Sequence, residues 1–261
     1  MRFRLRGLNF DFFPSNLHLA VMDAFYAPVK YISEKTVRLE GEEHHHLVHV
    51  MRKKIGEEIF TADGEGAMYR VRIALLHRDH AVCEIIERLP GYNELDSGVI
   101  LIQALLKNPN KMDWIIEKAT ELGVSRIFPV TTERTLTGKD KHDRWEALAL
   151  AAMKQSMRCR LPNIEHVEPF EKVISAMPKS SLFLFHEAAG YSQTISSEFH
   201  GHREENPIAV AIGPEGGFSE EEIALAIRHG AKILTLGKTR LRSETAAITA
   251  IARVTGVLKQ S

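Results

Sequence analysis

Hydrophobic and polar positions alternate over short stretches in the first third of the chain. Strands are predicted around residues 37–39, 59–60, 68–73 and 80–89. Short strands at about this spacing, with glycine-containing turns between them, are typical of a small all-β barrel or sandwich. We therefore expect a β-rich domain over residues 22–95.

The pattern changes after this unit. Residues 99–106 form a continuous apolar run, as expected of a strand that is buried on both faces. Pro109 is suited to begin a helix and Gly123 to end it. Strand-like and helix-like segments then alternate, which indicates an α/β domain with a largely parallel sheet over 99–261. The remaining strands are expected at 124–130, 181–187, 207–213 and 231–237, and another helix at 142–157.

The composition is that of a folded protein with a formal net charge of zero. The 261 residues include 34 Lys and Arg and 34 Asp and Glu, so any RNA site must be a local patch. Cys83 and Cys159 are too few for a disulfide framework or a four-cysteine zinc site. We expect two buried thiols in a reducing cytoplasm. No apolar run reaches the roughly 18 residues of a membrane span.

Residues 1–21 are interpreted as an N-terminal extension. Polar residues interrupt their apolar positions, which weighs against a signal peptide. Met22 begins a new pattern, and we expect it to be the start of the folded unit. The alternative is an additional strand or arm.

Three strand ends in the last third of the chain carry the candidate chemistry, because open parallel sheets bind ligands beyond the carboxyl ends of their strands. They lie at residues 184–187, 211–218 and 236–246. The glycines of GPEGGF let a ligand approach the backbone, and Ser219 with Glu222 resembles a helix capping box. A tight turn without a ligand is the alternative. The loop is neither GxGxxG nor a Walker motif, which weighs against a dinucleotide site.

The last of these segments adds charged groups. Arg240 and Arg242 are suited to pair with a phosphate or a carboxylate. Ser243 suits the N-cap of a final helix, and Glu244 suits the positive end of its dipole. The two glycine-bearing strand ends are more specific together than either is alone.

The segments IGPEGGFSEEEI (212–223) and LGKTRLRSETAA (236–247) resemble the signature of the RsmE family of ribosomal RNA methyltransferases. The likeness runs from about Phe25 to the end of the chain and includes EEHHHLVHVMRKKIGEEIF, NKMDWIIEKATELGVSRIFPVTTERT and AAMKQSMRCRLPNIE. Lys154, Met157 and LGKTRLRSETA, in place of the more usual LGxRILRTETA, depart from the family pattern. The resemblance implies a SPOUT-type α/β domain with a trefoil knot, preceded by a PUA-like β-barrel that binds RNA.

The resemblance also implies an activity, which is methylation of N3 of a uridine in 16S rRNA of the small ribosomal subunit. The implied cofactor is S-adenosylmethionine, and the implied assembly is a homodimer. Uracil N3 carries a proton, so a base must remove it or a cation must stabilise the anion. We expect Arg242 to stabilise the anion, and Glu215 or Glu244 to act as the base or to orient it. The residues expected to hold the cofactor are Leu184, His186, Ile212, Gly213, Pro214, Gly216, Gly217, Leu236, Gly237, Leu241, Thr245 and Ala246.

Basic and polar residues outside these loops are expected to contact RNA. They are Arg52, Lys53, Arg134, Gln155 and Arg158. The first two belong to a histidine-rich stretch over 44–54. We expect no metal there, because no carboxylate or cysteine pattern accompanies the histidines. The alternative for this stretch is a solvated turn in which Leu47, Val50 and Ile55 pack inward.

Two other functions are compatible with the sequence. A non-catalytic RNA-binding or ribosome-assembly protein would keep the fold, but the intact GPEGG and Arg-x-Glu-Thr segments speak against lost chemistry. An α/β enzyme that binds a small nucleotide without RNA is the second, and the basic stretch of the β-rich domain speaks against it.

Overall fold

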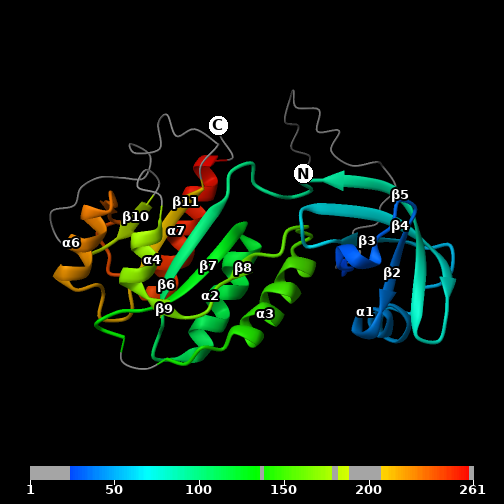
Figure 1. Ribbon diagram of the computed structural model, residues 1–261, viewed down its shortest axis with the longest axis horizontal. Coiled ribbons are helices and arrows are strands. Elements are labelled where there is room, and N and C mark those ends of the chain that lie inside the picture. The colour runs from blue at the N-terminus through cyan, green and yellow to red at the C-terminus, as the bar shows by residue number, and fades with distance from the viewer. Residues whose placement is uncertain (1–23, 136–137, 178–181, 188–206, 259–261) are drawn as a thin grey trace, which may run out of the picture.

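The computed structural model describes residues 24–135, 138–177, 182–187 and 207–258. The chain forms two lobes that lie side by side, a small N-terminal one and a larger C-terminal one (Figure 1). Residues 1–21 and Met22 lie outside the described residues, so the interpretation of this segment as an extension stays a prediction.

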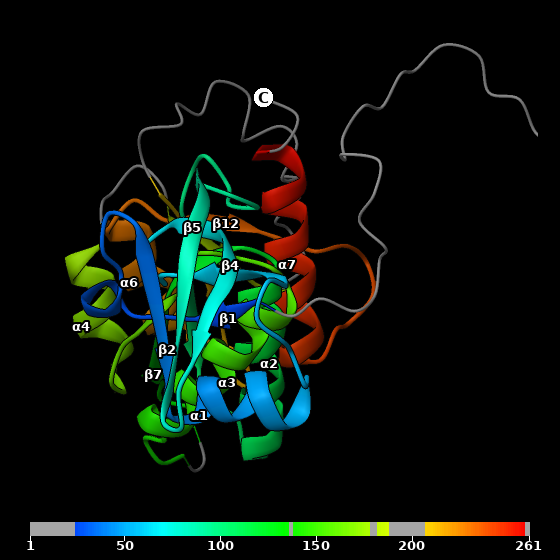
Figure 2. The same ribbon diagram turned by 90° about the vertical axis from the view of Figure 1, so that its right-hand side faces the viewer.

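The small lobe is built on a five-stranded sheet. Its strands are β1 (Phe25–Tyr26), β2 (Thr36–Glu40), β3 (Glu58–Ala62), β4 (Ala67–Leu76) and β5 (His80–Pro90). Their order is β1-β3-β4-β5-β2, in which β1 and β3 are parallel and the other neighbours are antiparallel. Figure 2 shows this lobe from its own side, with β2, β4 and β5 curling beside α1 (Gly41–His45). The expected all-β character is confirmed, with short helical insertions.

The histidine-rich stretch is helical. α1 runs directly into a π-helical turn over His46–Val50. Leu47 is fully buried, whereas Val50 and Ile55 are 58% and 61% exposed. The alternative interpretation, in which Val50 and Ile55 pack inward with Leu47, is therefore wrong. Val50 is the last residue of the π-helical turn and Ile55 lies beyond it, so the two residues do not continue the buried face of Leu47.

The larger lobe is an α/β unit. Its elements are β6 (Val99–Ala104), α2 (Pro109–Glu121), β7 (Val124–Thr131), α3 (His142–Gln155), β8 (Asn163–Ile164), β9 (Glu168–Pro169), α4 (Phe170–Ala176), β10 (Leu182–Phe185), β11 (Ile208–Ile212), α6 (Glu220–Arg228), β12 (Lys232–Leu234) and α7 (Ser243–Leu258). The strands form one sheet in the order β12-β10-β11-β6-β7-β8, and β9 also pairs with β7. Every pairing in this sheet is parallel, as predicted.

Helices cover both faces of the parallel sheet. One core cluster joins Leu101 of β6 to α2, α3 and α7, and the other joins the adjacent Ile102 to α4 and α6. Figure 1 shows this sandwich of helices around the strands. Because successive side chains of a strand enter opposite faces, a strand covered on both sides must be apolar throughout. Among the described residues, no helix is long and apolar enough to span a bilayer.

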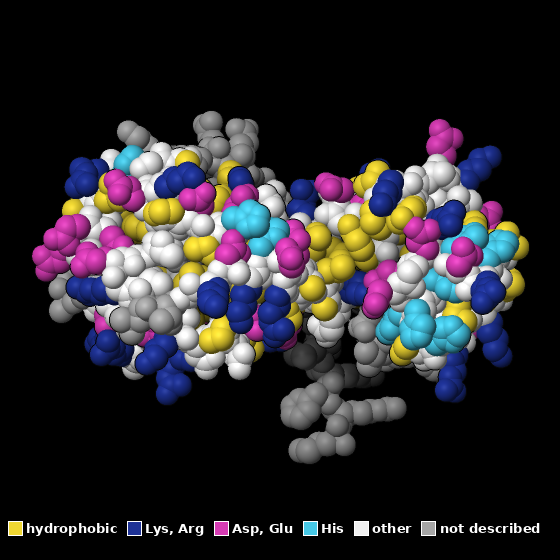
Figure 3. Space-filling view, turned by 60° about the horizontal axis from the view of Figure 1, so that its bottom comes forward, with side chains coloured by type: hydrophobic (Ala, Val, Ile, Leu, Met, Phe, Trp, Pro, Cys, Tyr) yellow, Lys and Arg dark blue, Asp and Glu magenta, His cyan; other side chains and the backbone are white. Residues whose placement is uncertain are grey.

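The two lobes meet along the segment that follows α3. The Lys154 ammonium pairs with Glu43 at 2.5 Å, and the backbone N–H of Leu161 donates to the carbonyl of Gly64 at 2.9 Å. Met68 and Met153 share a small apolar core at this junction. Figure 3 shows apolar side chains gathered where the lobes meet. Both cysteines are buried free thiols, as expected.

Candidate functional site

Three neighbouring strands end at the same edge of the parallel sheet. β10 lies between β12 and β11, and Phe185 is in register with both Leu234 and Ile212. The chain therefore leaves the sheet at adjacent points, at His186, at Gly213 and at Thr235. The carboxyl ends of such strands are where open parallel sheets bind ligands.

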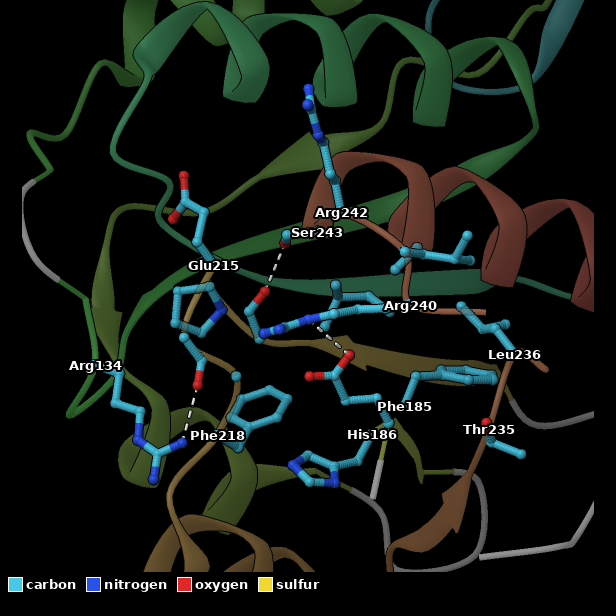
Figure 4. Close-up of a pocket in the computed structure, with 18 of the residues that line it drawn as sticks. Arg134, Phe185, His186, Glu215, Phe218, Thr235, Leu236, Arg240, Arg242 and Ser243 are labelled. Atoms are coloured by element: carbon cyan, nitrogen blue, oxygen red, sulfur yellow. Dashed lines mark hydrogen bonds and ion pairs between the residues drawn. The ribbon is translucent and has the colours of Figure 1, made fainter. Parts of the chain in front are cut away.

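A cavity of about 880 Å³ lies among these strand ends. Its volume is within the range of about 300–1,000 Å³ that is usual for small-molecule sites. Phe185, Ile212 and Leu236 give it apolar walls, and the loops after β11 and β12 present backbone groups to it (Figure 4). The cavity thus combines apolar walls and backbone groups with charged side chains, which are Lys111, Arg134, Glu187, Glu215, Arg240 and Arg242.

The GPEGGF loop has a conformation that its glycines require. Gly217 has φ +70°, which a side chain would strain. A Cβ on Gly213 would lie 3.1 Å from the backbone of Gly217 and Phe218. The loop ends at the predicted capping box, which is confirmed: Ser219 accepts a hydrogen bond from the N–H of Glu222, and the Glu222 carboxylate accepts one from the N–H of Ser219. This loop is therefore held at both its beginning and its end.

A buried hydrogen-bond chain joins the cavity loops to β6. The Gln103 amide donates to Ser243 Oγ at 3.2 Å, and Ser243 Oγ donates to the carbonyl of Gly213 at 2.5 Å. Gln103 is fully buried. Ser243 was expected to cap the final helix, but its hydroxyl donates to Gly213. The sequence analysis did not single out Gln103, although a lone amide in the apolar run 99–106 is a signal of a buried polar contact.

Two of the three predicted catalytic residues line the cavity. Arg242 and Glu215 both line it. In Figure 4 the Arg242 side chain extends away from His186 and Phe218. The Glu215 carboxylate accepts a hydrogen bond from the backbone N–H of Lys107 at 3.2 Å.

Glu244 has a different setting. Its carboxylate pairs with Lys111 of α2 at 2.9 Å and does not line the cavity. Burial acts to raise the pKa of this carboxyl, but the Lys111 ammonium, the residue's own backbone amide and Arg242 outweigh it and lower the pKa below its usual value. Glu244 is therefore held as an anion.

A second ion pair crosses the cavity. Arg240 Nε lies 3.2 Å from Glu187 Oε2, and both residues line the cavity. Glu187 follows β10, whereas Arg240 follows β12, so the pair links two strand ends (Figure 4).

Most residues expected to hold the cofactor line this cavity. They are His186, Ile212, Gly213, Pro214, Gly216, Gly217, Leu236, Gly237, Leu241 and Ala246. Two do not. Leu184 lies in the core cluster with α4 and α6, because its side chain enters the sheet face opposite to Phe185. Thr245 is exposed in the first turn of α7.

The residues expected to contact RNA are scattered. Arg134 is exposed at the cavity, and its Nη1 donates to the carbonyl of Gly216 at 2.9 Å. Arg52, Lys53 and Gln155 do not line the cavity. Arg52 is exposed on the small lobe with φ +53°, Lys53 pairs with Glu57 at 3.1 Å, and Gln155 is exposed at the end of α3.

The expectation that Arg158 contacts RNA is wrong. Its side chain is 3% exposed and pairs with Glu94 at 2.6 Å. Nη1 also donates to the carbonyls of Thr120 and Val124 at 2.7 and 3.1 Å. A guanidinium whose donors are used inside the protein does not reach a phosphate, so Arg158 is a structural residue.

The family of the chain follows from two comparisons. An RNA methyltransferase domain matches residues 93–255, which are more than half of the chain, and an RNA methyltransferase PUA domain matches residues 39–86. A ribosomal RNA small subunit methyltransferase E from Synechocystis sp. is 32% identical over 231 residues, which cover 87% of this chain and 75% of that protein. The chain belongs to the ribosomal RNA small subunit methyltransferase E family. The resemblance noted in the sequence is thereby confirmed.

Other members of the family are similar over almost their whole length. The methyltransferase E of Bacillus subtilis is 28% identical over 233 residues, which cover 84% of this chain and 89% of that protein. The crystal structure of the Neisseria gonorrhoeae methyltransferase E bound to S-adenosyl methionine has a TM-score of 0.78 and 30% identity, covering 90% of this chain and 98% of that one. A Legionella pneumophila methyltransferase in complex with the same cofactor has a TM-score of 0.74 and 28% identity, covering 92% and 97%. The expected PUA-like and α/β architecture is confirmed, and the trefoil knot stays a prediction.

Proposed function

We propose that this protein transfers a methyl group from S-adenosylmethionine to N3 of a uridine in 16S rRNA of the small ribosomal subunit. The observation that carries the proposal is the cavity at the ends of β10, β11 and β12, in a chain that belongs to a family of ribosomal RNA methyltransferases. Two relatives with the same architecture are crystallised with this cofactor.

The residues of the cavity fit the cofactor chemically. A nucleoside needs backbone donors and acceptors for its base and apolar walls for its rings. The loops after β11 and β12 offer the first, and Phe185, Ile212 and Leu236 offer the second. A Cβ placed on Gly217 would meet only His186, at 3.9 Å, and one on Gly237 would meet nothing within 4 Å. Backbone at these glycines is thus open to a ligand.

The residues of this chain then have distinct roles. When bound, the cofactor supplies a methyl group on a sulfonium, which is an electrophile. Uracil N3 must lose its proton to present a lone pair, and the resulting anion needs a cation close by. We assign that role to Arg242, which lines the cavity and carries a guanidinium with five N–H donors.

The two candidate carboxylates separate by position. Glu215 lines the cavity, whereas Glu244 does not line it and pairs with Lys111, which does. A carboxylate with a lowered pKa is a weak proton acceptor, so Glu244 is poorly suited to be the base. We assign proton acceptance to Glu215, and Glu244 to the positioning of Lys111.

Assembly and location belong to the same proposal. We infer a homodimer in the cytoplasm from the family resemblance. Three apolar residues of α7, Ala247, Ile251 and Val254, are buried in the core of the larger lobe, so this side of the helix is not available to a partner. Trp114 of α2 is 42% exposed and is a better candidate for a contact between subunits. Light scattering of the wild type and of Trp114→Ala tests this assembly.

Methyl transfer to isolated small-subunit rRNA and to assembled small subunits tests the activity. The expected result is transfer of an isotope-labelled methyl group from S-adenosylmethionine to a single uridine, which mass spectrometry then identifies as 3-methyluridine. Arg242→Gln should retain cofactor affinity and lose roughly 10²–10³ in single-turnover rate, the usual effect of removing one preorganised charge-stabilising donor. RNA binding without transfer to either substrate would favour the non-catalytic alternative.

A further inference from the structure

The ion pair between Arg240 and Glu187 is weak. One guanidinium nitrogen makes the contact, at 3.2 Å, and the two side chains are 76% and 54% exposed. Exposed pairs of this kind contribute little to the stability of a protein. Each side chain can therefore leave the other and bind a new partner at a small cost in free energy.

Other charged residues of the cavity are engaged elsewhere. Arg134 donates to the carbonyl of Gly216, and Lys111 pairs with Glu244. Arg242 extends away from the floor of the cavity, whereas Arg240 lies across it (Figure 4). Within the described part of the chain, Arg240 has Glu187 as its one ion-pair partner.

The two carboxylates that line the cavity also differ in their partners. Glu215 also lines the cavity, but its carboxylate accepts from the backbone N–H of Lys107. Glu187 lines the cavity directly after His186 and pairs with Arg240. Arg240 and Glu187 are thus the charged side chains of the described lining that pair with each other, and they do so between the apolar walls of the cavity.

We propose that Arg240 and Glu187 bind the zwitterionic amino-acid end of the cofactor, the guanidinium taking the α-carboxylate and the carboxylate taking the α-ammonium. The inference rests on the proposed function, since it presumes that this cavity holds S-adenosylmethionine. A zwitterion replaces one exposed ion pair by two and leaves the charge of the site unchanged. An arginine also suits a carboxylate because its planar fork can donate two parallel hydrogen bonds.

The loop after β12 holds a second cation near Arg240. Lys238 and Arg240 lie two positions apart in the segment LGKTRLRSETA. The side chain of Arg240 enters the cavity, and Lys238 of the same loop does not line it. Lys238 therefore supplies a matched control for loss of a positive charge.

Calorimetry with two ligands tests the proposal. S-adenosylhomocysteine carries the amino-acid end, and 5′-methylthioadenosine has the same adenosine and sulfur but lacks it. Arg240→Gln should weaken S-adenosylhomocysteine by roughly tenfold to a hundredfold, the effect of one charged hydrogen bond, and leave 5′-methylthioadenosine unchanged. Glu187→Gln should act in the same direction, and Lys238→Gln should change neither affinity.

The outcomes are distinct. If Arg240→Gln weakens the binding of both ligands equally, or of neither, the proposed clamp, which is the binding of the amino-acid end by Arg240 and Glu187, is overturned. Binding of both ligands by the wild type would still support the cofactor site. Failure of the wild type to bind both ligands refutes the proposed cofactor and the clamp together. A loss of RNA affinity in Arg240→Gln with S-adenosylhomocysteine affinity intact also overturns the clamp and makes Arg240 a phosphate contact. Circular dichroism and melting curves establish that each variant is folded.

Discussion

Arg158→Ala tests whether Arg158 stabilises the fold or contacts RNA. The substitution removes a guanidinium that is 3% exposed and leaves the Glu94 carboxylate, which is 8% exposed, without its cation. The carbonyls of Thr120 and Val124 lose their donor at the same time. Glu94 keeps two backbone donors, the N–H groups of Cys159 and Arg160 at 3.0 and 2.8 Å.

The expected magnitude follows from this geometry. Removing one partner of a buried ion pair destabilises a protein by about 3–5 kcal/mol, because the remaining charge stays buried. In a chain of this size each kcal/mol lowers the melting temperature by roughly 2–4 °C, so a fall of about 6–20 °C is expected. Arg158→Ala/Glu94→Gln should recover part of the loss, since the double variant buries no unpaired charge.

Arg126 offers a matched control. It also pairs with a glutamate, Glu165, but its side chain is 46% exposed. Arg126→Ala should cost about 0–1 kcal/mol. The assay is thermal unfolding followed by circular dichroism, together with RNA binding at several salt concentrations. An Arg158→Ala variant that melts like the wild type and binds RNA with a flatter salt dependence would refute the structural role and restore the phosphate contact.

Three further predictions follow from the site and the core. Ser243→Ala removes the donor to Gly213 and should weaken S-adenosylhomocysteine binding by roughly fivefold to tenfold in calorimetry, with affinity restored in Ser243→Thr, which keeps the hydroxyl. Burial raises the pKa of Cys83 to about 12 and that of Cys159 to about 11, so neither thiol should react with Ellman's reagent at pH 8 until the protein is unfolded. The pKa of Glu244 is lowered, so its pair with Lys111 stabilises the fold at pH values above the ordinary glutamate pKa and this contribution is lost as the pH falls through the lowered value. Lys111→Met should therefore lower the free energy of urea unfolding at neutral pH, and this difference should shrink as the pH falls through the lowered pKa of Glu244.

The fold was largely predictable from the sequence, because its signals are local. The continuous apolar run at 99–106 predicts a doubly covered strand, and the structure places β6 in the middle of the sheet. Pro109 begins α2, and Gly123 follows its end with φ +97°. The π-helical turn at His46–Val50 was not predicted, since strand-like alternation and helical periodicity are hard to distinguish over so few residues.

The site was predictable only in part. The rule about strand ends located its loops, because a parallel sheet brings the ends of neighbouring strands together whatever their sequence. It could not determine which side chains face the cavity. Leu184 and Phe185 are adjacent in β10 and both apolar, yet they enter opposite faces of the sheet, and only Phe185 lines the cavity.

Charge alone also says little about role. Arg134, Arg158 and Arg242 all belong to family-like segments, but one supports the backbone of Gly216, one is buried against Glu94, and one borders the cavity. These fates depend on partners far away in the chain. Glu94 precedes Arg158 by 64 positions, so no local pattern relates the two residues.

The hydrogen-bond chain from Gln103 through Ser243 to Gly213 shows why such distant partners matter for the proposed chemistry. The two bonds span 140 and 30 positions in the sequence, and they fasten the loop after β11 to the start of α7. Arg242 precedes Ser243 directly, so the same bonds fix the backbone from which its guanidinium reaches the cavity rim. A preorganised cation is effective only if its support does not move when charge develops. The buried Gln103 amide supplies that support from β6, because it donates both to Ser243 Oγ and to the carbonyl of Ala104 in its own strand.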